Sequence, residues 1–224
     1  MKTEWLSKKS SDTLLLFYNG WGMDKNVLNH FNFDCDVLMF YDYRSLSVGD
    51  LPDFSAYTTI RLLAWSMGVW AAANTLHLFD VEPEYAVAVN GSELPVDDSF
   101  GIPEKIYLLT EKGMDNRGRD KFLSRMFDSV EDRERFFTDN MPARELSEQI
   151  EELTQIRIAS ALNHNSIHWD KALISVNDRI FPSENLFNYW NEKTNVITLQ
   201  SGHYPFFVLK NMIFSENIPK LLCF

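Results

Sequence analysis

The sequence predicts an α/β fold built on a largely parallel sheet of about six strands that is flanked by helices. Three observations favour this class: short apolar runs recur along the chain, most of them are continuous in hydrophobicity, and helix-like segments lie between them. A continuous apolar run is typical of a strand covered on both faces, as in parallel sheets. Strands that alternate with helices define the α/β class.

Six apolar runs are predicted to be the strands. In chain order they are residues 14–18, 37–41, 60–64, 85–89, 172–176 and 196–199. The clearest helix covers residues 67–76, which are rich in alanine and follow the third strand directly. Two shorter helices are predicted after the last two strands, at residues 184–190 and 206–214.

The alternation breaks between residues 101 and 165, where the sequence is charged and helix-prone. Apolar residues recur there at helical spacing, at positions 122, 123, 126 and 127 and again at 146, 150, 153 and 156. The run 106–110 stays open between a further strand and a helix, because a short apolar run fits either. We expect one α/β domain over residues 1–224, with a helical lid insertion at 101–165.

Composition limits the class of protein. A chain of 224 residues can bury one sizeable core, and its 45% hydrophobic content excludes a disordered protein. No apolar run approaches the roughly 20 residues that cross a bilayer, and none at the N-terminus has signal-peptide length, so we expect a cytoplasmic location. The net charge of −11 argues against broad binding to nucleic acids or anionic membranes, because phosphate groups favour basic surfaces.

Neither the cysteines nor most histidines suggest a metal or redox site. Cys35 and Cys223 are far apart and lack paired spacing, so we interpret each as a buried or incidental thiol and expect no disulfide framework. His164 and His168 are four residues apart, yet no acidic zinc signature accompanies them. No metal and no other cofactor is therefore expected. The remaining histidines interpreted as structural or surface residues are His30 and His77.

A candidate nucleophile stands where the third strand meets its helix. The sequence there is Ala64-Trp65-Ser66-Met67-Gly68, and a nucleophile elbow needs a strand, a sharp turn that carries the serine, and then a helix. Small residues two positions to either side let strand and helix pass closely, although Ala64 replaces the first glycine of G-x-S-x-G. The alternative role for Ser66 is a helix N-cap, which is common for serine at such a boundary.

Two backbone amides are candidates for an oxyanion hole. The first strand ends in Asn19-Gly20-Trp21-Gly22, where glycines let the backbone bend at the sheet edge. Acyl transfer places negative charge on the former carbonyl oxygen, and the N–H groups of Trp21 and of Met67 can stabilise it. The alternative is a tight turn in which the Trp21 indole only covers the core, and the indole could also line an acyl pocket.

His203 is the best candidate for the general base, because it lies in a turn after the last predicted strand. Asp178 follows the fifth strand at the corresponding edge, which gives the chain order Ser66, Asp178, His203 that hydrolases show. The imidazole would take the serine proton, while the carboxylate fixes its tautomer and stabilises its charged form. Asp178 also fits an Asx turn, so Asp97 and Asp170 stay open as the acid.

Five motifs together cover most of the chain, at residues 19–22, 64–68, 89–91, 177–179 and 202–206. This set resembles the BioG family of pimeloyl-acyl-carrier-protein methyl ester esterases. The resemblance implies an α/β-hydrolase that cuts the methyl ester masking the pimeloyl chain during biotin synthesis and leaves the carrier thioester intact. It implies Ser66 as nucleophile, Asp178 as acid, His203 as base and Trp21 at the oxyanion hole. It also implies that the short N-terminus leaves no room for an antiparallel hairpin.

Arginine is concentrated in the insertion, which holds seven of the ten arginines of the chain. Twelve acidic residues accompany them between residues 111 and 165, so the first expectation is a solvated helical surface with i,i+4 pairs. Collectively the arginines could instead grip an acidic acyl carrier protein or its phosphopantetheine by charge-assisted hydrogen bonds. The candidates for this contact are Arg117, Arg125 and Arg133.

Two rival functions stay open from the sequence. The same three residues could serve a general carboxylesterase, a lipase-like enzyme or a thioesterase, and a hydrolase fold could also be a catalytically silent binding module. Ser66, Asp178 and His203 beside the Trp21 turn argue against the silent form. Nothing in these residues selects the ester.

Overall fold

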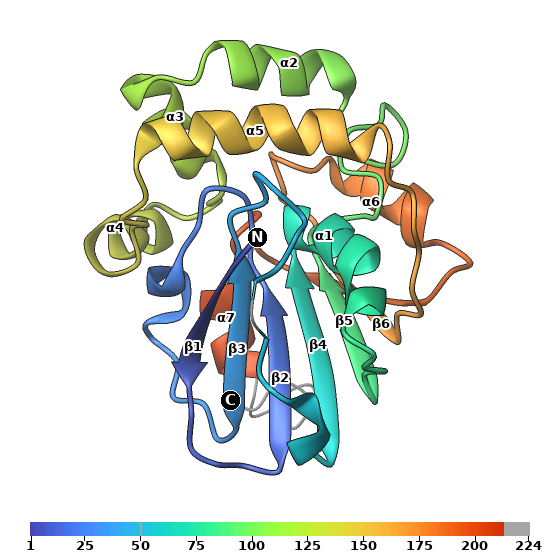
Figure 1. Cartoon of the computed structure of the whole chain (residues 1–224). Helices are drawn as coiled ribbons and strands as arrows, with labels where there is room; N and C mark the ends of the chain where they lie inside the picture. The colour runs from blue at the N-terminus through green and yellow to red at the C-terminus, as the bar shows by residue number, and fades with distance from the viewer. Residues whose placement is uncertain (50, 213–224) are drawn as a thin grey trace.

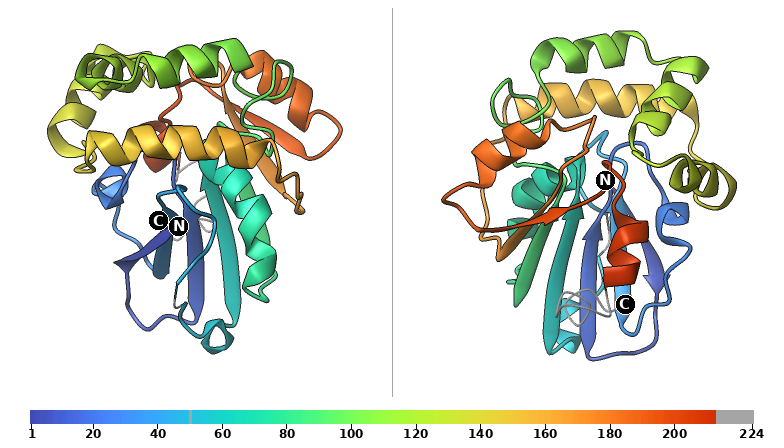
Figure 2. Two further views of the ribbon diagram at one scale, coloured as in Figure 1. Left: turned by 45° about the horizontal axis from the view of Figure 1, so that its top comes forward. Right: turned by 180° about the vertical axis from the view of Figure 1, so that it is seen from behind.

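The computed structural model describes residues 1–49 and 51–212 and has the predicted α/β architecture (Figure 1). Its sheet has seven strands in the order β1-β3-β2-β4-β5-β6-β7. The strands from β2 to β7 are parallel, and helices α1 and α7 lie on opposite faces of the sheet (Figures 1 and 2). The predicted fold class is therefore confirmed.

The six parallel strands lie within one residue of the predicted runs at each end. The strands are β1 (Lys2–Ser7), β2 (Thr13–Tyr18), β3 (Asp36–Tyr41), β4 (Thr59–Trp65), β5 (Tyr85–Val89), β6 (Lys171–Ser175) and β7 (Asn195–Leu199). In β2, every side chain from Leu14 to Tyr18 is fully buried. Burial on both faces explains why this run is continuous in hydrophobicity.

Strand β1 is a difference from the prediction. It pairs antiparallel with β3 at the edge of the sheet, and none of its six residues is fully buried. Its sequence mixes polar and apolar residues, so it lacks the continuous apolar run that marks the other strands. This one antiparallel strand pairs with β3 and not with β2, the next strand of the chain, so β1 and β2 do not form a hairpin.

The helices agree with the prediction and settle its open segment. They are α1 (Met67–Thr75), α2 (Glu104–Lys112), α3 (Asn116–Arg125), α4 (Val130–Asp139), α5 (Leu146–Ser160), α6 (Ser183–Trp190) and α7 (Phe206–Met212), with 3-10 turns η1 (Lys25–Leu28), η2 (Phe54–Ala56) and η3 (Leu76–Leu78). Residues 106–110 belong to α2 and are helical. The end of the predicted helix 206–214 lies outside the described residues.

Helices α2 to α5 follow one another between β5 and β6, where the insertion was predicted. In Figure 1, α2 and α5 run across the top of the molecule, above the carboxyl ends of the parallel strands. Asp115 caps α3 and Ser129 caps α4, each by accepting a backbone N–H of the first turn. The insertion thus covers the edge at which the predicted site residues leave the sheet.

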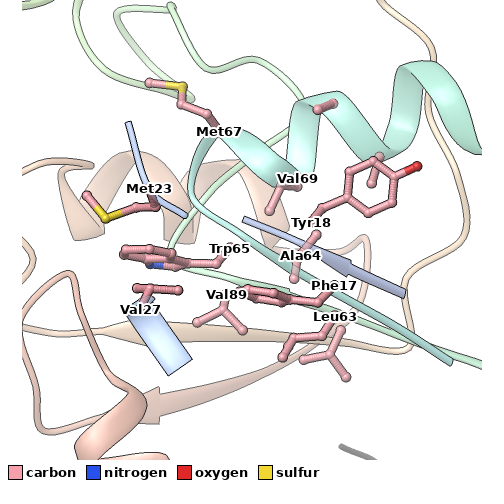
Figure 3. Packing of buried hydrophobic residues seen from close by; sticks show 14 of the residues in the cluster. Phe17, Tyr18, Met23, Val27, Leu63, Ala64, Trp65, Met67, Val69 and Val89 are labelled. Atoms are coloured by element: carbon pink, nitrogen blue, oxygen red, sulfur yellow. The ribbon is translucent and has the colours of Figure 1, made fainter. Parts of the chain in front are cut away.

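The core beneath this edge is closely packed where β4 enters α1. Figure 3 shows the Trp65 indole next to Met23 and Val27, below the start of α1. Helix α1 is buried over its whole length. A Cβ on Gly68 would lie 2.3 Å from the carbonyl oxygen of Tyr18, so only glycine allows α1 to approach β2 this closely. This approach fixes where α1 begins relative to the sheet.

Two expectations from composition can be compared with the structure. Cys35 is buried but disulfide-bonded, so its interpretation as a simple thiol is wrong; Cys223 lies outside the described residues. In the part of the chain that the structure describes, none of the helices has both the length and the apolar character needed to cross a membrane.

Candidate active site

Ser66 stands at the sharp turn between β4 and α1, with the left-handed backbone angles φ 58° and ψ −125°. Its N–H donates to the carbonyl of Val89 (2.9 Å), and its carbonyl accepts the N–H of Val69 (3.1 Å). A Cβ on Gly91 would lie 2.2 Å from the Ser66 carbonyl oxygen. The Ser66 side chain makes no capping hydrogen bond, so the alternative N-cap role is not supported. A strained backbone held by its neighbours is what a nucleophile elbow requires.

The structure brings Ser66, His203 and Asp178 together. His203 Nε2 lies 2.9 Å from Ser66 Oγ, and His203 Nδ1 lies 2.7 Å from Asp178 Oδ2. The other carboxylate oxygen of Asp178 accepts the N–H groups of Ile180 (2.8 Å) and Phe181 (3.0 Å). The side chains of His203 and Asp178 are 2% and 0% exposed. A buried chain of hydrogen bonds therefore runs from the carboxylate through the imidazole to the hydroxyl.

The loop of His203 is held by residues to which the sequence analysis gave no role. Asn90 Nδ2 donates to the His203 carbonyl (3.0 Å) and to Ser175 Oγ (2.8 Å), and Asn90 Oδ1 accepts the Ser175 N–H (2.7 Å). Trp65 Nε1 also donates to the His203 carbonyl (2.9 Å). The Phe181 ring stacks on the imidazole at a centroid distance of 5.9 Å. The sequence could have pointed to Asn90 through its position immediately after β5, which matches the position of Ser66 after β4.

The two alternative acids are engaged elsewhere. Asp97 Oδ1 accepts the N–H groups of Ser99 (2.8 Å) and Phe100 (2.9 Å) in a local turn. Asp170 precedes β6, at the edge of the sheet opposite to Ser66, and accepts the Ala86 N–H (2.8 Å). Neither carboxylate is a hydrogen-bond partner of His203 in the described chain.

The other histidines lie away from Ser66. The three exposed ones are His77, His164 and His168. Burial lowers the pKa of His30 to about 4, and its Nδ1 lies 3.2 Å from Asn140 Nδ2. Within residues 1–49 and 51–212, no group of three or more histidine, cysteine or acidic residues is arranged to hold a metal ion.

The turn after β2 adjoins the same pocket as Ser66. Trp21 and Met67 line this pocket, and neither backbone N–H has a hydrogen-bond acceptor among the described residues. Gly22 has φ 72°, a backbone conformation that favours glycine. A Cβ on Gly20 would lie 2.9 Å from the Trp65 ring, so the turn packs directly against the indole that holds His203. Two amides are thus available near the hydroxyl.

The pocket is narrow, with a cavity volume of about 30 Å³, and it opens partly to solvent. Helices α2, α3 and α5 supply much of its wall, and Arg125 and Arg179 are the two arginines that line it. Its apolar lining includes Trp21, Met23, Trp65, Met67, Ile102, Ile106, Phe122, Met126, Leu153 and Ile180. The chemistry of such a wall fits an aliphatic acyl chain.

The arginines of the insertion fall into different environments. Arg157 pairs with Glu111 (2.7 Å), as expected for a partly exposed surface. The expectation of a solvated surface is wrong for Arg144, because it is buried and its Nη1 lies 2.6 Å from the fully buried carboxylate of Glu152. Among the three candidates for a carrier contact, Arg125 lines the pocket, while the other two do not.

The chain matches, over residues 1–213, the family described as pimeloyl-ACP methyl esterase BioG. It belongs to the BioG family. The crystal structure of BioG from Haemophilus influenzae is similar at a TM-score of 0.84 and 36% identity, covering 91% of this chain and 94% of that one. An uncharacterized protein of the same organism is 37% identical over 210 residues, which are 92% of this chain and 94% of that protein.

Two further relatives place this BioG family member in a wider context. A malonyl-[acyl-carrier protein] O-methyltransferase from Bacteroides fragilis is 37% identical over 212 residues, which are 93% of this chain but only 43% of that protein. An esterase from Exiguobacterium antarcticum shares the fold at a TM-score of 0.64 and 14% identity, covering 98% of this chain and 94% of that one. The family and the α/β-hydrolase fold together place the chain among ester hydrolases.

Proposed function

We propose that this protein removes the methyl ester from pimeloyl-acyl-carrier-protein methyl ester in biotin biosynthesis, with Ser66 as nucleophile. The observation that carries the proposal is the buried hydrogen-bonded chain from Asp178 through His203 to Ser66, at an apolar pocket of a BioG family member. The chain of hydrogen bonds supports the proposed mechanism, and membership of the BioG family supports the proposed substrate.

The reaction has two halves. In the first, His203 Nε2 takes the proton of Ser66 as Oγ attacks the ester carbonyl, and the same proton then goes to the leaving methoxide, which departs as methanol. Asp178 holds Nδ1–H and stabilises the imidazolium. In the second half, His203 activates a water that hydrolyses the acyl-enzyme, releases the carboxylate and restores Ser66. The Trp21 and Met67 N–H groups stabilise the oxyanion in both halves.

The pocket and the insertion would set the substrate. The apolar walls suit the methylene chain of the pimeloyl group, and the helical segment 101–165 would act as a lid that keeps water from the reacting ester. The acyl carrier protein would contact Arg117 and Arg125 of α3 and Arg133 of α4. Of these three arginines, Arg125 would also contact the substrate, because it lines the pocket itself.

The test is an incubation of the purified protein with pimeloyl-acyl-carrier-protein methyl ester, followed by mass spectrometry of the carrier. We expect the carrier-bound ester to become the carrier-bound acid, with methanol released and the thioester intact. Release of the carrier thiol would indicate a thioesterase, and equal turnover of unrelated esters a general carboxylesterase. Absence of both turnover and fluorophosphonate labelling would indicate a silent binding module.

A further inference from the structure

Glu152 of helix α5 is a fully buried carboxylate in the frame of the candidate active site, with 0% of its surface exposed. Its Oε1 accepts the N–H of Tyr43 (2.7 Å), just after β3. Its Oε2 accepts the N–H of Gly22 (3.1 Å), in the turn after β2, and Nη1 of Arg144 (2.6 Å). One side chain of the insertion therefore binds the backbone just after two neighbouring strands, β2 and β3.

Gln149, nearly one turn earlier on α5, binds the same turn. Its side-chain Nε2 donates to the carbonyl of Gly22 (2.8 Å), and its backbone carbonyl accepts Nε1–H of Trp21 (2.9 Å). Together with Glu152, it engages both backbone polar groups of Gly22 and the indole of Trp21. Helix α5 thus holds the Trp21 side chain and, through Gly22, the peptide that follows Trp21. Because these contacts fix Trp21 from its C-terminal side, the direction of the Trp21 N–H depends on this helix.

The carboxylate of Glu152 has the partners that an ionised buried group needs. Burial raises the pKa of Glu152, while the Arg144 guanidinium and the Tyr43 N–H oppose that shift. Arg144 is 5% exposed and lies 3.2 Å from Asp42, which places a second carboxylate on the guanidinium. Loss of Arg144 would leave the Glu152 charge buried without its cationic partner, whereas Arg144 would still face Asp42 if Glu152 were replaced.

We propose that Glu152, assisted by Gln149, is a positioning residue that aims the Trp21 N–H at the oxygen of the reacting ester. The inference rests on the proposed function, because it assigns Trp21 to the oxyanion hole. It also assigns α5 a second role: the helix is part of the active-site frame and has to stay in place during turnover. Only the remaining helices of the insertion are then free to act as a lid.

The test compares Glu152→Gln with the matched control Glu148→Gln. Glu148 lies one turn earlier on α5, where it pairs with Lys2 (3.3 Å), with Arg44 (2.8 Å) and, more distantly, with Arg144 (4.0 Å), and it makes no hydrogen bond to the Trp21 turn. With a small soluble ester, kcat of Glu152→Gln should fall roughly 10- to 100-fold while KM stays within about twofold, the size expected for a misplaced oxyanion donor. Affinity for a trifluoromethyl ketone, which mimics the oxyanion, should fall by the same factor. Glu148→Gln should keep both values.

Unchanged kcat and unchanged ketone affinity in folded Glu152→Gln would overturn the inference, as would a change confined to KM. If Glu152→Gln does not fold, as judged by thermal unfolding, Gln149→Leu decides, because it removes the hydrogen bond to Gly22 without leaving a buried charge. Unchanged kcat in Gln149→Leu would then overturn it. The proposed function fails separately, if Ser66→Ala keeps its esterase activity.

Discussion

Left-handed backbone marks the residues on which the candidate active site depends. Gly22 follows β2 with φ 72°, Ser66 follows β4 with φ 58°, and Asn90 follows β5 with φ 46°. Outside glycine such angles cost energy and persist only where the surroundings impose them. Each bend turns the chain at the carboxyl edge of a neighbouring strand. One bend presents the serine, and the other two hold the Trp21 amide and the His203 loop.

Substitution of the three hydrogen-bonded residues should affect activity far more than folding. Ser66→Ala should abolish fluorophosphonate labelling and lower kcat by roughly 10⁴-fold or more, with little change in melting temperature, because it removes one hydroxyl. His203→Ala should be nearly as damaging and Asp178→Asn somewhat less so. Steady-state kinetics beside thermal unfolding checks this order. A severe loss in Asp97→Asn, with Asp178→Asn active, would show that the acid is assigned wrongly.

Asn90 offers a more selective test of the His203 loop. Asn90→Gly keeps the left-handed backbone available but removes the hydrogen bonds to the His203 carbonyl and Ser175. The backbone carbonyl of His203 then loses one of the two side chains that donate to it, so the imidazole is held less firmly. We therefore expect kcat to fall about tenfold with KM nearly unchanged. Trp65 still donates to the same carbonyl, so the loop should not unfold. If kcat keeps its wild-type value, the Trp65 hydrogen bond alone is enough to place the imidazole.

At the scale of elements, β1, β3 and α5 are joined by a charged cluster around Asp42. Asp42 is buried and pairs with Lys2 of β1 (2.9 Å), with Arg44 (2.7 Å) and with Arg144 (3.2 Å). Burial alone would favour the neutral acid, yet hydrogen bonds from Arg44 and Lys2 and the charge of Arg144 hold the pKa of Asp42 well below its usual range. The ionised carboxylate thus helps to fasten the edge strand to the insertion.

This depressed pKa predicts an acid-sensitive part of the stability. Because the folded pKa lies below the unfolded value of about 3.9, the contribution is present above pH 4 and is lost as the pH falls through the folded value. Asp42→Asn, which tolerates the left-handed φ of 62°, should cost about 2 to 3 kcal/mol at pH 7. Its deficit in denaturant unfolding should shrink below pH 4. A deficit that stays constant down to pH 2 would contradict this account.

The elements differ in how well the sequence predicts them, for physical reasons. Buried strands leave a continuous apolar run, so β2 to β6 were predictable. The edge strand β7 is partly exposed but keeps the apolar run 196–199, whereas the edge strand β1 has no such run and was not predicted. Ser66, Asp178 and His203 were predictable because each follows a strand, and parallel strands end at one edge. Glu152 was not, because its partners Gly22 and Tyr43 are more than 100 positions away and nothing local distinguishes it from the surface acids of the insertion.

At the scale of the whole molecule, the insertion covers the edge that holds Ser66, so under the proposed function a carrier-linked acyl chain would enter beside it (Figure 1). Arg125 at the end of α3 and Arg179 after β6 both line the pocket. Both are exposed, in a chain with a net charge of −11. Local positive charge near the pocket is therefore the feature that an acidic carrier would recognise.

Charge reversal of Arg117→Glu, Arg125→Glu and Arg133→Glu together should raise KM for a carrier-linked methyl ester by about tenfold or more. KM for a small soluble ester should change much less, because that substrate does not dock on the outer helices. High salt should reproduce the effect on the wild type, since screening shortens to about 3 Å at 1 M ionic strength. Kinetics on the two substrates at low and high salt test this. Equal losses on both would mean that the arginines support the fold and not a partner.

The close contact between Gly20 and Trp65 should couple the evolution of these two positions, which are far apart in the sequence. A side chain at position 20 would collide with the indole, and loss of the indole would remove a hydrogen bond from the His203 carbonyl. A single substitution at either position should therefore give a poorly active protein. Among homologous sequences we expect the two to covary, with a larger residue at 20 only where 65 is small. Directed evolution should likewise recover changes at these positions as pairs.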